Sequence, residues 1–273
     1  MSSVHALSHM QYRAHCVGYF PLLPSFVKQA IAWGKGMPNM SSRVGLGREN
    51  ADFATKDFLK RAGLRTDYVI KIDPSGVPES ELLHVLSDLF KKTMLQETFS
   101  NFLYTTDPDV TLIAKPGDCP VAIVAATLPD GLPLLGLLHA GRTQLDTYVP
   151  SQAMALLQTL GCDMKSTFVG IAPSIAYDNY YVRSEDVEKL IKRNNWEMRK
   201  RAKEKDGKLF LDLLGYFFDQ LIDAGIPEEN IQAYQLDTLT AAQHRETFSQ
   251  RYASYSGGDE QNGRFLVAAE LAE

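Results

Sequence analysis

Three short apolar runs in the middle of the chain constrain its fold more than any other feature. They cover residues 110–114, 121–126 and 134–139, and each has the length of a buried strand rather than that of a helix. Between the last two runs, Pro129-Asp130-Gly131 combines residues that favour a tight turn. We therefore expect a β-hairpin that links the second run to the third, inside a β-rich central region.

The rest of the chain mixes helices and strands without a regular alternation. Apolar residues at helical spacing predict helices over 50–62, 79–90, 149–160, 184–196 and 210–224. Short apolar segments predict strands over 14–20, 68–72, 167–171, 231–235 and 265–269. This irregular order favours an α+β fold over a doubly wound one. We expect residues 1–15 to form a disordered leader and residues 16–273 to form a single domain of mixed β-sheets flanked by helices.

Composition and charge exclude several classes of protein. The chain has 273 residues, of which 45% are hydrophobic and 22% charged, as is ordinary for a globular protein. The net charge of −5 argues against a nucleic-acid-binding protein, and no apolar run approaches the roughly 20 residues of a membrane span. The three cysteines predict a reducing compartment and a cytoplasmic location. Residues 198–208 interleave basic with acidic side chains, which indicates a solvated helix face or loop rather than an anion-binding patch.

A cysteine and a histidine mark the edges of the predicted hairpin strands. Cys119 follows a Pro-Gly-Asp turn just before the second apolar run, and His139 ends the third run, directly before an Ala-Gly pair. A thiol and an imidazole at the ends of adjacent strands can hold a soft metal together, or act as a nucleophile and its base. A third interpretation is that Cys119 only packs in the core, as free cysteines often do. We assign Cys16 and Cys162 to structure, because they lack polar neighbours of this kind.

Two motifs around these residues resemble the laccase-domain family, also called YfiH-type or DUF152 proteins. Gly117-Asp118-Cys119-Pro120-Val121 is similar to the family's Ala-Asp-Cys-x-Pro-Val, and Leu138-His139-Ala140-Gly141-Arg142 is similar to its His-Ala-Gly-Trp-Arg-Gly. Further segments resemble the family in the same order along the chain: Gly170-Ile171-Ala172-Pro173-Ser174-Ile175, Tyr180-Tyr181-Val182, Phe210-Leu211-Asp212-Leu213, Phe248-Ser249-Gln250-Arg251 and Asn262-Gly263-Arg264.

The resemblance implies both a fold and a chemistry. The fold is the α+β fold shared with the cytotoxic necrotizing factor deamidases. The chemistry is that of a zinc site made by His, Cys and His, which acts on purine nucleosides by phosphorolysis and by deamination of adenosine. The older family label of multicopper laccase fits this sequence poorly. Several coppers need many histidines, and three of the six histidines here lie in the first fifteen residues.

The first histidine of the family's zinc site is missing from this chain. In the equivalent stretch, residues 71–77, Asp73 stands in its place, and aspartate is an acceptable zinc ligand. The implied zinc ligands are therefore Cys119, His139 and Asp73. The alternative is that Asp73 only starts the turn before a proline, as aspartate often does. His84 is a second candidate for the missing ligand.

Four further residues are candidates for the chemistry. Arg43, Arg142 and Arg264 suit a phosphate group, because a guanidinium matches the geometry of an oxyanion. Arg43 is equally well interpreted as a plain surface residue, and Arg142 stands where the family has tryptophan. Asp118 is the fourth. One interpretation makes Asp118 a catalytic residue that orients His139 or a ligand from its place beside the cysteine. The alternative is that Asp118 only holds its own loop by hydrogen bonds.

These observations predict a zinc-dependent purine nucleoside phosphorylase or adenosine deaminase that acts through a Cys/His site. Its partners are then a small-molecule purine nucleoside and phosphate, with no nucleic acid and no membrane, and the oligomeric state stays open. Two kinds of alternative remain. One is a metal-free Cys–His hydrolase that acts on amides, and the other is a catalytically impaired purine-binding protein or a partner-binding subunit.

Overall fold

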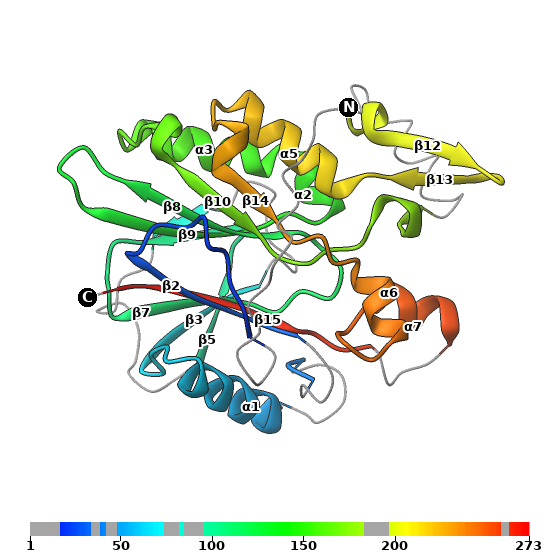
Figure 1. Ribbon diagram of the computed structural model, residues 1–273, viewed down its shortest axis with the longest axis horizontal. Coiled ribbons are helices and arrows are strands. Elements are labelled where there is room, and N and C mark those ends of the chain that lie inside the picture. Colours follow the sequence, from blue (N-terminus) through cyan, green and yellow to red (C-terminus); the bar gives the residue numbers. More distant parts are fainter. Residues whose placement is uncertain are drawn as a thin grey trace.

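Two six-stranded sheets form the centre of the molecule, and a small three-stranded sheet extends from one side (Figure 1). This computed structural model describes residues 17–33, 39–41, 48–73, 82–84, 95–182, 197–257 and 262–272. The first sheet contains, in spatial order, β1 (Val17–Gly18), β2 (Val27–Ala32), β15 (Leu266–Leu271), β7 (Val110–Ala114), β3 (Tyr68–Asp73) and β5 (Leu95–Phe99). The second contains β14 (Ile231–Ala233), β10 (Phe168–Ile171), β8 (Val121–Thr127), β9 (Pro133–His139), β6 (Phe102–Thr105) and β4 (Leu82–His84). The third contains β11 (Tyr181–Val182), β13 (Lys208–Leu211) and β12 (Ala202–Lys205).

The strands β8 and β9 lie in the middle of the second sheet, and their residues are buried on both faces. In β8, Val121 and Ile123 belong to the core between the two large sheets, whereas Ala122 and Val124 belong to the core beneath the helices. This alternation follows from the period of two in a strand. A strand with two buried faces carries apolar residues at every position, which is why this segment is an unbroken apolar run in the sequence.

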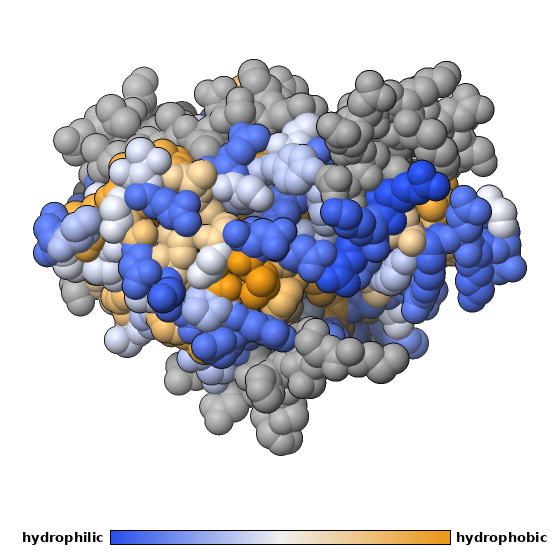
Figure 2. Space-filling view, turned by 90° about the horizontal axis from the view of Figure 1, so that it is seen from above, coloured by the Kyte–Doolittle hydropathy of each residue, from blue (hydrophilic) through white to orange (hydrophobic). Residues whose placement is uncertain are grey.

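Helices cover the outer faces of both large sheets (Figure 1). The helix α1 (Arg48–Arg61) packs on the first sheet through Phe58 and Leu59, and α3 (Val149–Thr159) and α5 (Leu213–Asp223) pack on the second. The outward side of the layer formed by α3 and α5 is mostly hydrophilic, with a few apolar residues between (Figure 2). In the part of the chain that the structure describes, no helix has the length and apolar character needed to cross a membrane.

The predicted α+β class is confirmed, together with its main local signals. The hairpin between β8 and β9 turns at Gly131, which has a φ of +88°. Gly63 and Gly161 follow α1 and α3 with φ angles of +74° and +88°, as expected for glycines that end helices. Strands are also present near the positions predicted over 68–72, 110–114, 167–171, 231–235 and 265–269.

Two predicted segments have a different structure. Residues 82–84, expected inside a helix over 79–90, form β4 and pair in parallel with β6. The edge of the second sheet supplies hydrogen bonds there that outweigh a helical spacing of leucines. The charged segment 198–208, expected as a helix face or loop, contains a 3-10 turn followed by β12 and the start of β13.

Other differences concern the ends of elements and strands that carry no clear signal. The helix expected over 210–224 begins only at Leu213, because Lys208–Leu211 pair in β13 and Asp212 caps the helix by accepting a hydrogen bond from the Gly215 amide. The strands β2, β5 and β6 are absent from the predictions. The predicted leader over 1–15 and the predicted helix over 184–196 lie outside the described residues.

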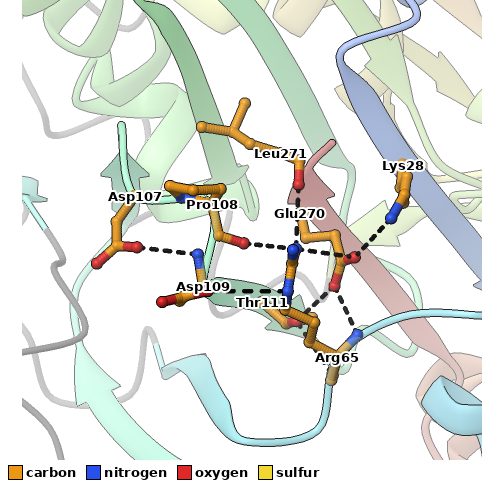
Figure 3. Close-up of polar contacts among 8 residues, drawn as sticks. All are labelled: Lys28, Arg65, Asp107, Pro108, Asp109, Thr111, Glu270 and Leu271. Carbon is orange, nitrogen blue, oxygen red and sulfur yellow. Dashed lines mark hydrogen bonds and ion pairs between the residues drawn. The ribbon is translucent and has the colours of Figure 1, made fainter. Parts of the chain in front are cut away.

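A buried carboxylate fastens a central strand of the first sheet. Glu270 in β15 has no exposed surface, and it accepts hydrogen bonds from the Arg65 backbone amide at 2.6 Å and from the Thr111 hydroxyl at 2.9 Å (Figure 3). Its other carboxylate oxygen lies 3.4 Å from Arg65 Nη1 and 3.6 Å from Lys28 Nζ. These partners compensate the buried charge and join β15 to β2, to β7 and to the segment before β3.

We expect Glu270→Ala to lower the free energy of unfolding by about 3–5 kcal/mol, because it leaves the charges of Arg65 and Lys28 without their buried counter-charge. Urea denaturation followed by circular dichroism measures this difference. Lys28→Ala is the control: its side chain is 48% exposed, so its removal should cost less than about 1 kcal/mol. Equal losses for the two variants would contradict the role assigned to the carboxylate.

Candidate functional site

The predicted Cys/His pair lies where two neighbouring strands of the second sheet meet their loops. β8 and β9 pair antiparallel, with Val121 opposite His139. Beyond this pair, the Ala140 amide donates to the Pro120 carbonyl at 2.9 Å, so the ladder continues past the end of β9. Cys119 precedes Pro120 directly. The register therefore places the thiol and the imidazole at the same edge of the sheet.

A glycine allows the side chains of this edge to approach one another. A β-carbon on Gly141 would lie 3.1 Å from Cys119 Sγ, 3.2 Å from His139 Cε1 and 2.9 Å from Gln144 Oε1. Gly141 has a φ of −69°, so the glycine is required for space and not for a left-handed backbone. The structure thus brings Cys119 and His139 together, and it adds Gln144 to them.

Asp118 ties the cysteine loop to two helices of the C-terminal region. The carboxylate of this buried residue accepts a hydrogen bond from the Thr238 hydroxyl at 2.8 Å, in α6 (Thr238–Gln243), and one from the Arg251 amide at 2.8 Å, in α7 (Gln250–Ser256). The Ser249 side chain is a further hydrogen-bond partner. Burial raises the pKa of Asp118, while these hydrogen bonds oppose the rise. Its contacts support the interpretation that Asp118 holds its own loop.

Burial keeps both members of the Cys/His pair uncharged near neutral pH. It raises the pKa of the Cys119 thiol to about 11, with the Asp118 charge adding to the rise and Arg264 opposing it. Burial also lowers the pKa of His139 to about 4, while the charge of Asp73 opposes this shift. A preformed thiolate–imidazolium pair would need the reverse order of these two pKa values. The metal-free nucleophile–base alternative therefore receives no support from the electrostatics of the site.

Positive charge borders the cysteine loop. A β-carbon on Gly117 would lie 3.1 Å from Arg264 Nη1, so the guanidinium passes close to the backbone just before Cys119. Its charge lowers the pKa of both Cys119 and His139. Arg264 was predicted as a phosphate-binding residue, and the structure places it beside the Cys/His pair.

Two more guanidinium groups gather at a buried tyrosine. The Arg251 guanidinium carbon lies 4.6 Å from the centre of the Tyr180 ring, in a cation–π contact. Burial raises the pKa of Tyr180, whereas the charges of Arg251 and Arg142 lower it and that of Cys119 raises it. Arg142, the second predicted phosphate-binding residue, therefore also lies near the site. Arg43, the third, lies outside the described residues.

Asp73 lies near the Cys/His pair, but the described residues do not place it in a group of metal ligands. It is buried at the end of β3, and its charge raises the pKa of His139. Over the residues that the structure describes, however, no three side chains of His, Cys, Asp or Glu are placed to hold a metal ion together. The Asp73-Cys119-His139 ligand set thus stays a prediction. Only the backbone of His84 is described, within β4.

The donors at the Cys/His pair suit zinc in their chemistry. Thiolate and imidazole are the two most common protein ligands of zinc. Within the described part of the chain, His139 Nδ1 is a buried ring nitrogen that has no hydrogen-bond partner. A buried polar atom without a partner is costly unless something else satisfies it, and a metal is one such partner. Cys119 and His139 fit zinc as two ligands of a site.

Three residues of the site carry no role in the predictions from sequence. Tyr180 and Arg251 lie within motifs that resemble the laccase-domain family, so their place in those motifs was the available signal. Gln144 carries no such signal, because it stands where the sequence departs from the family's His-Ala-Gly-Trp-Arg-Gly. Only the packing around Gly141 shows that its carboxamide faces the pair.

Two mixed sheets with a cysteine and a histidine at adjoining strand ends, together with a family-model match over most of the chain, define a protein of the laccase-domain class. Residues 82–271 match the family described as multi-copper polyphenol oxidoreductase laccase, and the chain belongs to this family. The comparison with curated proteins gives no match.

Three solved structures share the fold over nearly the whole chain. Bacillus licheniformis hypothetical protein YfiH has a TM-score of 0.77 at 18% identity, covering 96% of this chain and 99% of that one. YlmD from Geobacillus stearothermophilus has a TM-score of 0.76 at 20% identity, covering 97% and 99%. Neisseria meningitidis protein NMB0706, of the DUF152 family, has a TM-score of 0.69 at 16% identity, covering 94% and 98%. At such low identity the likeness establishes the fold alone.

We expect alkylation of Cys119 by iodoacetamide, in protein freed of metal by a chelator, to be slow at neutral pH and to accelerate with rising pH. Thiolate is the reactive form, and its fraction grows about tenfold for each pH unit up to the raised pKa of about 11. Peptide mass spectrometry separates Cys119 from the other two cysteines. A rate that is already maximal at pH 7 would show that the thiol is ionised and would restore the metal-free nucleophile.

Proposed function

We propose that this protein is a zinc-dependent enzyme of purine nucleosides, a phosphorylase with adenosine deaminase activity, whose centre is the Cys119–His139 pair. The observation that carries the proposal is the convergence of a thiol and an imidazole over Gly141 beside several guanidinium groups. Phosphorolysis of a nucleoside requires both a group that activates the purine and a positively charged surface that binds phosphate. Here the zinc-binding pair would activate the purine, and the guanidinium groups would bind the phosphate.

Cys119 and His139 would hold the zinc, which when bound supplies a Lewis acid that polarises a purine or a water. The chain's own residues prepare that role. His139, with its pKa lowered to about 4, is neutral at physiological pH and so keeps a lone pair for a ligand. Asp118 fixes the cysteine loop through α6 and α7. The family description speaks of several coppers, whereas His139 is the histidine that the described part brings to this site.

The guanidinium groups account for the second substrate. In phosphorolysis, a phosphate oxygen forms a bond to the ribose C1′ while the bond from C1′ to the purine nitrogen breaks, and the purine leaves with a proton. Phosphate carries negative charge throughout, and Arg264, Arg251 and Arg142 supply positive charge around the cysteine loop. In deamination, water replaces the amine at C6 and ammonia leaves, so no phosphate is needed. The two reactions therefore differ in their need for the arginines.

We expect the zinc-loaded protein to turn over at least one member of a panel of adenosine, inosine, guanosine and methylthioadenosine in the presence of phosphate. Chromatography of the released base and of inosine measures both reactions. Cys119→Ala should abolish turnover and remove stoichiometric zinc, because it deletes the thiolate ligand of the proposed zinc site. Cys162→Ala, at a buried cysteine on the helix side of the second sheet, is the control and should retain both. No turnover across the panel by zinc-loaded protein would overturn the proposal.

Substitution of Arg264 separates the two reactions. We expect Arg264→Gln to raise the KM for phosphate in phosphorolysis by about 10–100-fold, the effect of losing a charge-assisted hydrogen bond of about 1.5–3 kcal/mol. The change in the KM for adenosine in deamination should be much smaller. Arg199→Gln, at an exposed arginine of the 3-10 turn before β12, is the matched control. An equal rise in both KM values would remove Arg264 from phosphate binding.

A further inference from the structure

Arg251 carries a positive charge that no ion pair within the described part of the chain neutralises. Other arginines are engaged by the fold: Arg201 forms an ion pair with Asp219, and the Arg264 guanidinium donates to the Gly263 carbonyl at 2.7 Å. Among the described residues, no carboxylate pairs with the guanidinium of Arg251. A half-buried guanidinium beside the site without a carboxylate is a group suited to bind an anion.

The hydroxyl of Tyr180 has a proton to donate beside this guanidinium. The central carbon of the Arg251 guanidinium lies 4.6 Å from the centre of the Tyr180 ring, and the Arg251 side chain is also a hydrogen-bond partner of the hydroxyl. Arginine only donates hydrogen bonds, so the phenolic oxygen accepts and its own proton is left for another acceptor. No described residue accepts that proton. Burial raises the pKa of Tyr180, so the phenol keeps its proton at neutral pH.

We propose that the Arg251 guanidinium and the Tyr180 hydroxyl together form the phosphate-binding subsite of the Cys119–His139 centre. The inference rests on the proposed function for the identity of the anion, and it names the two groups that bind this anion. Both groups donate hydrogen bonds, and a phosphate dianion offers several acceptor oxygens together with the opposite charge. A neutral ligand would satisfy the hydroxyl and leave the guanidinium without a counter-charge. The pair therefore favours an oxyanion.

Hydrogen bonds connect both groups to the cysteine loop. The Arg251 amide donates to the Asp118 carboxylate at 2.8 Å. The Ile175 amide, five residues before Tyr180, donates to the Asp118 carbonyl at 3.0 Å. Burial and the charge of Asp118 raise the pKa of the Cys119 thiol, and the charge of Arg251 opposes them. The guanidinium therefore acts at the sulfur of the proposed zinc site, as a group that holds the second substrate should.

The fold fixes the phenol before any ligand arrives. Tyr180 directly precedes β11, its amide donates to the Ala176 carbonyl at 3.1 Å, and its carbonyl accepts from the Leu211 amide at 3.0 Å. Its side chain is 7% exposed and belongs to the core beneath the helices. A donor held in this way loses little conformational freedom when a ligand binds, so its hydrogen bond contributes almost fully to affinity.

The test is the protection of Arg251 by inorganic phosphate in the full-length protein as purified. Phenylglyoxal modifies accessible arginines, and peptide mass spectrometry follows each arginine separately. We expect phosphate to slow the modification of Arg251, and chloride at equal ionic strength to leave it unchanged. Arg199, at an exposed position of the 3-10 turn before β12, is the internal control and should react equally fast with and without phosphate.

Tyr180→Phe keeps the ring beneath the guanidinium and removes only the hydroxyl. We expect it to raise the phosphate concentration that gives half protection by about 10–100-fold, the effect of losing a hydrogen bond to a charged acceptor. In the zinc-loaded protein it should raise the KM for phosphate similarly and change the KM for the nucleoside much less. Tyr68→Phe, at the end of β3 opposite to Asp73, is the matched control and should behave like wild type. Circular dichroism confirms that each variant is folded.

The outcomes separate this subsite from the proposed function. Absence of phosphate protection at Arg251 in wild type would overturn the subsite, even if the protein turns over nucleosides and even if Tyr180→Phe does not fold. Equal half-protecting concentrations in wild type and Tyr180→Phe, or a rise confined to the KM for the nucleoside, would also overturn it. Protection that depends on Tyr180, without turnover of any nucleoside, would support the subsite and overturn the proposed activity.

Discussion

β8 and β9 pair over their whole length, from Val121 opposite His139 to Thr127 opposite Pro133. Because side chains alternate across these strands, the pair supplies residues both to the core between the sheets and to the core beneath α3 and α5. A slip of one residue would exchange the two cores, so the packing on both faces fixes the register. The same register puts the cysteine loop beside His139. Fold and site thus depend on one strand pairing.

The second constraint is the burial of charge around the cysteine loop. Asp118 loses contact with water, and this cost is offset by hydrogen bonds from Thr238, Ser249 and the Arg251 amide. These bonds join the centre of the sheet to helices more than a hundred residues further along the chain. The charge of Asp118 in turn raises the pKa of Cys119. Together with burial, the carboxylate that positions the loop therefore also favours the protonated thiol near neutral pH, and a cation at the site would favour its ionisation.

The fold and the site have different tolerances to change of sequence. The architecture is shared with solved structures at 16–20% identity, because it needs only apolar residues at the right period and the right turns. The site needs particular atoms at particular points. Asp73 and Gln144 both lie near His139.

The sequence by itself determined what depends on near neighbours. The apolar runs, the turn at Gly131 and the helix ends at Gly63 and Gly161 predict the hairpin and the α+β class, because turn chemistry and apolar period act over a few residues. The pairing of Cys119 with His139 follows from that hairpin. Only the tertiary structure decided the rest. It turned residues 82–84 into a strand against β6, directed Asp118 toward α6 and α7, and brought Arg251, Tyr180 and Gln144 to the pair. These contacts join segments far apart in the chain or depend on the direction of one side chain, and neither leaves a periodic signal in the sequence.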